Sequence, residues 1–232
     1  MINKFEFSVK DKNVTSVQFS TGKWHLVIRD MESEMDAHRF LKFWQNIQRV
    51  DVYWKEGFEG FGFSDCHDNR LCRVHELHFI FPKSIKSFDF APFLFYPNLK
   101  SINIPNDEMT FSENPFCGLN VQLILPEGAT RTKFENGLLI VDNQLIGGAC
   151  CEGSVKIPDY VTSMLNDAFS HCKKMTECVV SKGITKIPNY AFECCSELIQ
   201  VEIPDSVKDI SENAFLGCYK LESPNVSKFQ KD

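Results

Sequence analysis

The stretch ITKIPNYAFECC at residues 184–195 decides the fold, because its pattern is present three times in this part of the chain. VTSMLNDAFSHC precedes it at residues 161–172, and VKDISENAFLGC follows it at residues 207–218. Each copy starts 23 residues after the one before it. Six apolar positions share this register: Ile157/Val180/Ile203, Val161/Ile184/Val207, Met164/Ile187/Ile210, Ala-Phe at 168, 191 and 214, Cys172/Cys195/Cys218, and Met175/Leu198/Leu221. A fixed period of this length is typical of stacked repeat proteins.

Within one repeat, the order of residues predicts a short strand, a turn and a return arc. Val201 and Ile203 alternate with polar neighbours, which is the period of a strand with one buried face. Pro204 ends the strand because it cannot donate to a ladder. A short helical or irregular arc then brings the Ala214-Phe215 pair back to the core. Stacked coils place equivalent residues in ladders, which accounts for the 21 phenylalanines.

The same register continues upstream in a looser form, and an irregular segment separates the two blocks. Ile-Pro equivalents stand at Phe81-Pro82, Ile104-Pro105 and Leu125-Pro126, which indicates three more repeats. Between them and Ile157-Pro158, the runs Leu138–Val141 and Gln144–Gly148 flank Asp142-Asn143. Two apolar runs around a two-residue polar turn predict an inserted β-hairpin.

These residues resemble the BspA-like leucine-rich repeat family. The strand ending in Ile-Pro, the Val-x-x-Ile turn, the Ala-Phe pair and the Cys three residues later are all present, most clearly in Ile184–Cys195 and Val207–Cys218. The hairpin resembles the irregular insert found before such repeats. The resemblance is close over about 137–224 and looser over about 74–136, with Ser181 standing where Pro is usual. It implies a curved solenoid that binds proteins or surfaces, without catalytic residues, and many members resemble microbial surface adhesins.

The first seventy residues lie outside the repeat pattern. Short strands are predicted at Phe5–Val9, Thr15–Phe19, Trp24–Ile28 and Arg49–Trp54. A capping box at Ser33–Asp36 precedes apolar residues at helical spacing, which predicts one amphipathic helix ending near Ile47. Because the end of a solenoid needs a cap, we interpret this segment as a cap of strands plus one helix.

The predicted fold class is therefore a β-rich α/β solenoid, a right-handed leucine-rich-repeat superhelix with an inserted hairpin and a strand-and-helix cap. Four parts are expected along the chain. They are the cap at 1–70, divergent repeats at 71–136, the hairpin at 137–152, and regular repeats with a C-terminal tail at 153–232.

Composition restricts the class of partner. A net charge of −6 argues against nucleic acid, which needs clustered Lys and Arg, and it mildly favours a basic protein. No apolar run has signal-peptide or transmembrane length, so if Met1 is the native start we expect a cytoplasmic protein without membrane insertion; a removed leader would make it secreted or surface-exposed. Most of the ten Cys are expected to be reduced core residues.

Two groups of residues invite a chemical interpretation, and a structural one is favoured for both. Cys66-His67, Cys72, His75 and His78 are of the types that bind zinc, but the last two are predicted on opposite faces of a strand. His171-Cys172 could form a Cys–His nucleophile, but Cys172 belongs to a repeated column of buried thiols. We therefore predict no catalytic, cofactor-binding or metal-binding residues.

The outward side of the strand ladder is the predicted protein-binding face. From the alternation along each strand and the repeat register, this face comprises His78, Ile80, Ser101, Asn103, Gln122, Ile124, Ser154, Lys156, Glu177, Val179, Gln200 and Glu202. An open sheet of mixed side chains suits a protein partner. The favoured function is a non-enzymatic intracellular binder, for example an inhibitor of a cognate basic protein. The alternatives are a secreted or surface adhesin, and an enzyme that uses the Cys66–His78 region.

Overall fold

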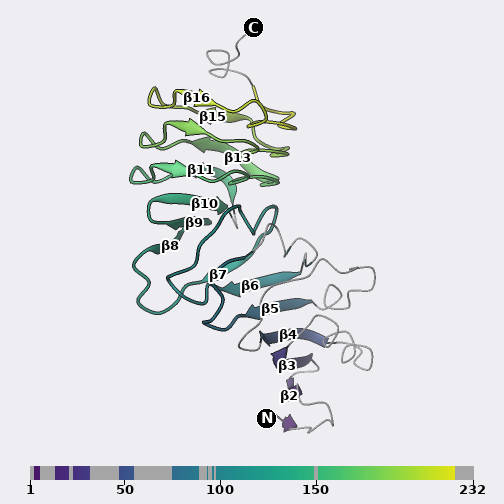
Figure 1. The fold of residues 1–232 in the computed structure, drawn as a ribbon. Coiled ribbons are helices and arrows are strands. Elements are labelled where there is room, and N and C mark those ends of the chain that lie inside the picture. The colour runs from purple at the N-terminus through teal and green to yellow at the C-terminus, as the bar shows by residue number, and fades with distance from the viewer. Residues whose placement is uncertain are drawn as a thin grey trace. The chain divides into compact units, whose positions relative to one another are not determined.

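The fold is taken from a computed structural model that describes residues 3–5, 14–20, 23–31, 47–54, 75–88, 93, 96, 98–148 and 151–222. The chain divides into two compact units. The first unit comprises Met1–Phe88, Phe95–Thr110 and Val121–Gly128, and the second comprises Asp89–Leu94, Phe111–Asn120 and Ala129–Asp232. Figure 1 shows the strands of each unit.

A single seven-stranded sheet in the order β1 to β7 organises the first unit. Its strands are β1 (Asn3–Phe5), β2 (Val14–Ser20), β3 (Lys23–Met31), β4 (Ile47–Trp54), β5 (Glu76–Ile80), β6 (Leu99–Asn103) and β7 (Gln122–Ile124). β1, β2 and β3 pair antiparallel, whereas all pairs from β3 to β7 are parallel. Parallel pairing from β3 onward is what stacked coils require, because each coil runs in the same direction as its neighbour.

Aromatic side chains fill the core of the first unit behind this sheet. Trp54 stacks on Phe81 with ring centroids 5.9 Å apart, and Phe79 meets Tyr96 edge-to-face at 5.0 Å. All four side chains are buried. The Phe81-Pro82 position, predicted from the repeat register, therefore faces the core as expected.

The strands predicted in the first seventy residues are confirmed in part. β2, β3 and β4 contain the predicted Thr15–Phe19, Trp24–Ile28 and Arg49–Trp54. β1 lies at Asn3–Phe5, earlier than the predicted Phe5–Val9. The predicted helix falls at residues 32–46, outside the described residues, and Ile47 opens β4. The parallel pairing of β4 with β5 shows that the ladder of coils already includes β4.

In its described residues, the second unit contains three small sheets. β8 (Thr132–Glu135), β9 (Leu138–Val141), β10 (Gln144–Gly148) and β12 (Ser163–Met164) form one of them. β11 (Glu152–Lys156), β13 (Lys174–Val179) and β15 (Gln200–Glu202) form a parallel sheet, one strand for each coil (Figure 1). β14 (Lys186–Ile187) and β16 (Asp209–Ile210) pair in parallel on the next side of the coils.

The inserted hairpin is confirmed. β9 and β10 pair antiparallel around Asp142 and Asn143, whose φ values of 48° and 64° are those of a tight type I′ turn. β8, which was not predicted, extends the hairpin into a meander through a second turn at Asn136-Gly137 with φ of 51° and 79°. An Asn-Gly pair between apolar runs is the strongest short-range hairpin signal, so this turn was predictable.

The helical part of the predicted fold class is wrong for the return arcs, because the described residues contain no helix. The arcs are turns joined from coil to coil: Phe169 N–H donates to Ala191 O at 2.7 Å, and Phe192 N–H to Ala214 O at 2.8 Å. A helix would use these donors within its own chain segment. Two residues after the phenylalanine the backbone turns left-handed, with φ of 60° at His171 and 53° at Cys194, a conformation that ends helices.

The repeat columns are confirmed as the core of the second unit. Phe192 lies between Phe169 and Phe215, with ring centroids 5.2 and 5.0 Å away and rings within 17° of parallel. Phe93 stacks on Phe116 in the same way at 5.7 Å. The residues of the other five columns are buried or partly buried in the same hydrophobic cluster. Residues that are 23 positions apart in the sequence therefore pack together in the core.

Two positions, Ser181 and Gly147, have local explanations. Ser181, where Pro is usual, is buried; its hydroxyl donates to Val161 O at 2.8 Å and accepts from Gly183 N–H at 3.1 Å. Gly147 leaves room for Asn114, since an added Cβ would come within 2.2 Å of that buried amide. Both residues therefore serve packing.

We expect Phe192→Ala to destabilise the protein by about 3–5 kcal/mol, because it empties the middle of the stack and leaves a cavity. Phe215→Ala is the matched control. Phe215 is partly exposed and stacks on one described ring, so its loss should cost roughly half as much. Urea unfolding followed by circular dichroism measures both changes. Equal effects of the two substitutions would contradict the stacking argument.

Candidate protein-binding faces and a pocket

The outward side chains of β11, β13 and β15 form what we call the second face: Ser154, Lys156, Glu177, Val179, Gln200 and Glu202. The predicted register is correct here. Ser154 pairs with Glu177 and Glu177 with Gln200, while Lys156 pairs with Val179 and Val179 with Glu202. Between them Val155, Cys178 and Val201 point inward and are buried. Strand alternation therefore separates the face from the core.

Charge on the second face is unevenly compensated. All six side chains are exposed except Val179, which is partly buried. Lys156 lies 3.9 Å from Asp159, but no ion pair within the described ranges involves Glu177 or Glu202. These two carboxylates flank Gln200 and Val179 on adjacent strands. The face thus combines negative charge, an amide and a small apolar surface.

The outward residues of β5, β6 and β7 form the first face: His78, Ile80, Ser101, Asn103, Gln122 and Ile124. The predicted register holds for the pairs His78–Ser101, Ser101–Gln122 and Asn103–Ile124. Gln122 is exposed and so is Ile124, at 49%, while Ile80 is partly buried. Only part of this face is therefore open to a partner.

Three residues of the first face, His78, Ser101 and Asn103, also make contacts within the protein. Ser101 is buried, with 7% of its surface exposed, and its Oγ lies 2.6 Å from His78 Nδ1. Asn103 holds the backbone of Phe81 with both ends of its amide, accepting from Phe81 N–H at 2.6 Å and donating to Phe81 O at 3.0 Å. The alternation of residues along a strand predicts which side of the sheet a side chain points to, but it does not predict the hydrogen-bond partner of that side chain.

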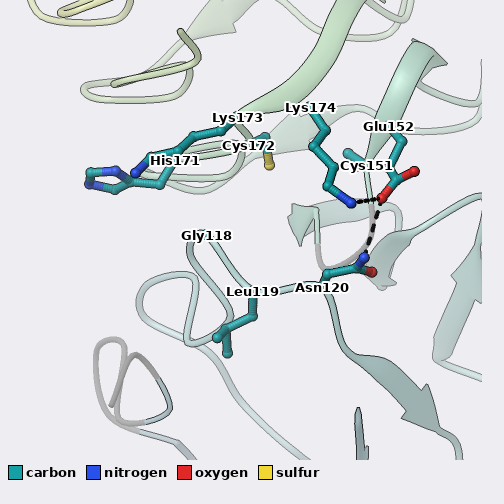
Figure 2. A pocket seen from close by; sticks show the side chains of 9 residues that line it. All are labelled: Gly118, Leu119, Asn120, Cys151, Glu152, His171, Cys172, Lys173 and Lys174. Carbon is teal, nitrogen blue, oxygen red and sulfur yellow. Dashed lines mark hydrogen bonds and ion pairs between the residues drawn. The ribbon is translucent and has the colours of Figure 1, made fainter. Parts of the chain in front are cut away.

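A pocket of about 320 Å³ lies in the second unit, at the amino ends of β11 and β13 (Figure 2). Glu152 and Lys174, which open these strands, form an ion pair at 2.5 Å, and Asn120 donates to the same carboxylate oxygen at 3.2 Å. The full lining is Gly118, Leu119, Asn120, Cys151, Glu152, His171, Cys172, Lys173 and Lys174. This pocket was not predicted from the sequence. The inserted hairpin separates residues 118–120 from residues 171–174, so the 23-residue period does not bring these lining segments together.

The cysteine column is held by hydrogen bonds to the preceding coil. Cys195 donates to Phe169 O at 3.0 Å, and Cys218 to Phe192 O at 2.9 Å. A hydrogen bond with the Cys218 thiol, together with burial, raises the pKa of Cys195 well above its usual range, and the same bond lowers the pKa of Cys218. The seven described cysteines are free thiols, as the repeat pattern suggested for most of the ten.

The interpretation of His171-Cys172 as a nucleophile and base finds no support. A hydrogen bond with Cys151, burial and neighbouring thiols raise the pKa of Cys172 well above that of a free thiol. A reactive cysteine needs the opposite shift. In Figure 2 the imidazole of His171 extends away from the sulfur of Cys172.

The zinc interpretation is tested only in part. Cys66, His67 and Cys72 lie outside the described residues, and His75 precedes β5 while His78 lies within it. Within the residues that the structure describes, no group of three or more His, Cys, Asp or Glu side chains is arranged to hold a metal ion. In the same residues, no helix is long and apolar enough to span a membrane.

Comparison with known proteins identifies the repeats. A family model for the BspA type leucine rich repeat region matches residues 69–143 and 129–231, with six copies. No curated protein matches the chain.

Solved structures of bacterial proteins are similar to this chain, and the first of those named below has the same fold. The pneumococcal vaccine antigen PcpA is 15% identical, with a TM-score of 0.52, over 85% of this chain and 60% of that one. A leucine rich cell surface protein from Faecalibacterium prausnitzii is 21% identical, with a TM-score of 0.48, over 77% and 57%. A leucine-rich repeat protein from T. pallidum is 16% identical, with a TM-score of 0.41, over 88% and 85%. The chain spans less than two thirds of the first two structures.

We expect iodoacetamide to label Cys218 of the native protein well before Cys195. Cys218 is partly exposed and its pKa is lowered, whereas Cys195 is fully buried, so labelling of Cys218 should begin at a lower pH than that of an ordinary thiol. Cys195, with its raised pKa, should react only after unfolding. Peptide mass spectrometry over a pH series measures both rates, with urea-unfolded protein as the control. Labelling of native Cys195 as fast as Cys218 would contradict the assignment.

Proposed function

Because the chain belongs to the BspA-type leucine-rich repeat family, we propose that it is a non-enzymatic scaffold that binds another protein through its second face. Proteins of this family are generally not enzymes. Leucine-rich repeats commonly bind proteins along the open face of the strand ladder, where each coil contributes side chains to one surface.

The observation that carries this proposal is the pair of carboxylates on the second face. Glu177 and Glu202 are exposed and make no ion pair with any described residue. They lie beside Gln200 and Val179 on a sheet whose backbone is fixed by parallel pairing. A rigid surface with uncompensated negative charge favours a partner that presents Lys or Arg, since complementary charge speeds and orients association.

The partner's footprint must extend past the six side chains of the second face. A stable interface takes roughly 20–30 residues from each side. The ion pair Glu152–Lys174 continues the face at the amino ends of β11 and β13, and Glu197–Lys220 lies in the same repeat position. We therefore place the second face at the centre of the contact and these ion pairs at its rim.

Two biological settings fit a protein-binding scaffold. In the first, the protein acts inside the cell as an inhibitor of a cognate basic protein, in keeping with the net charge of −6. In the second, it is a secreted or surface adhesin, in keeping with the Faecalibacterium protein that is described as a cell surface protein. The comparisons give no support to the cytoplasmic location expected from the sequence.

Thiol titration separates the two settings. For the intracellular inhibitor we expect about ten reactive thiols when protein purified from its native host is denatured without reductant. Export through an oxidising compartment would leave fewer, because neighbouring cysteines would pair. The count is made with a chromogenic disulfide reagent, and a reduced sample serves as the reference.

We expect the triple substitution Glu177→Lys, Gln200→Lys and Glu202→Lys to lower partner capture from host lysate more than about tenfold. It places like charges against a basic partner, which costs several kcal/mol. Quantitative mass spectrometry of the captured proteins measures the loss.

The matched control is Asn189→Lys, Asp205→Lys and Glu212→Lys. These residues are exposed on the turns and return arcs, and their substitution changes the net charge by the same amount. Capture should be retained by this control. A partner that both triple variants bind as well as the wild type would exclude the second face as the binding site.

A further inference from the structure

The pocket of the second unit is held open by two contacts that fix its walls. Gly118 N–H donates to Ser170 O at 3.2 Å, and Asn120 donates to Glu152 at 3.2 Å. The segment 118–120 is thereby tied to the coil that contains 171–174 and to β11. The hollow lies between these ties, so it is a fixed feature of the second unit (Figure 2).

The walls of the pocket are mainly apolar. Leu119 and the thiols of Cys151 and Cys172 line it, and lysine stems add methylene groups. Its volume of about 320 Å³ is at the lower end of the range for ligand pockets, roughly 300–1,000 Å³. Such a space accepts one apolar side chain or a ligand of similar size.

The charge at the rim is positive on one side. Glu152 neutralises Lys174, and Asn120 occupies the same carboxylate oxygen. Lys173 makes no ion pair with any residue that the structure describes, and its side chain extends with that of His171 away from Glu152 in Figure 2. An anionic group entering the pocket would therefore meet an uncompensated ammonium at Lys173.

The rim is open to solvent, which favours a group projecting from a larger partner. Gly118, Asn120, Glu152, Lys173 and Lys174 are all exposed, whereas small ligands are usually enclosed over most of their surface. The pocket also adjoins the second face, since Lys174 and Glu177 belong to the same strand. Three residues along a strand span roughly 10 Å.

We infer that the pocket receives the C-terminal residue of the partner polypeptide, with an apolar side chain against Leu119 and the terminal carboxylate beside Lys173. A terminal residue is the simplest unit that carries both groups at once. This inference rests on the proposed function, because the same partner would place its basic surface over Glu177 and Glu202. A partner with a basic surface and an apolar C-terminus fits both sites.

Binding of short peptides to the full chain tests the inference. The probes are a five-residue Gly/Ser peptide ending in leucine with a free carboxylate, and the same peptide with a C-terminal amide. We expect the carboxylate form to bind more tightly, by about two- to fivefold for one exposed charge pair. Chemical-shift titration by NMR measures both affinities and locates the site. Equal affinities, no binding, or shifts away from the pocket would overturn the inference.

Two substitutions at the rim should act in opposite directions. Lys173→Gln should weaken binding of the carboxylate peptide about two- to fivefold, since it removes the uncompensated cation. Glu152→Gln should strengthen it, because Lys174 then becomes available and a nearby negative charge is lost. Lys182→Gln, at an exposed lysine that does not line the pocket, is the control and should change nothing. Weaker binding by Glu152→Gln would contradict the proposed role of Lys173 and Lys174.

A free acid of the same shape shows whether a polypeptide is needed. 4-Methylpentanoate carries the leucine side chain and a carboxylate without a peptide bond, and we expect it to bind more weakly than the peptide. Equal affinity would overturn the assignment to a polypeptide terminus in favour of a small carboxylic acid. None of these measurements uses Glu177 or Glu202. The proposal for the pocket and the proposal for the second face can therefore be refuted independently.

Discussion

The structure depends on one constraint: each coil must present the same kind of residue at the same position, because it hydrogen-bonds to the next coil. Phe192 shows how strictly this constraint limits the choice of residue. Its N–H donates to Ala214 O, its ring lies between two other phenylalanine rings, and its carbonyl accepts from Cys218. Shifting the chain by one residue would break all three contacts together. Repetition in the sequence is thus a direct result of contact between identical elements.

Much of the fold could be predicted from the sequence because of this constraint. The columns, the strand phase of Glu177, Gln200 and Glu202, and the hairpin around Asp142-Asn143 all follow from period and turn chemistry. The return arcs could not be assigned in the same way. Their apolar spacing is compatible with a helix, and only the bonds between coils and the left-handed residues at His171 and Cys194 decide otherwise. Glycine at the equivalent Gly118 and Gly217 was the available hint.

The candidate sites were less predictable, for a physical reason. Outward phase placed Ser101 and Asn103 on the first face, but both have polar groups that find partners within the protein. The pocket arises where residues 118–120 meet the coil of His171. Gly118 and His171 each stand two residues after the phenylalanine of their coil, and Gly118 N–H donates to Ser170 O as His171 N–H donates to Glu193 O. The inserted hairpin separates these two coils in the sequence by more than one repeat length, so the 23-residue period does not show that they are in contact.

The phenylalanine stack also bears on how a partner could fit. The coils are joined there by N–H···O bonds of 2.7 and 2.8 Å, and they are joined on the strand side by parallel pairing. Both sides of each coil are thus held at the spacing of hydrogen-bonded backbones, about 4.8 Å. A partner that contacts several coils must therefore place its own contacting groups at multiples of that spacing.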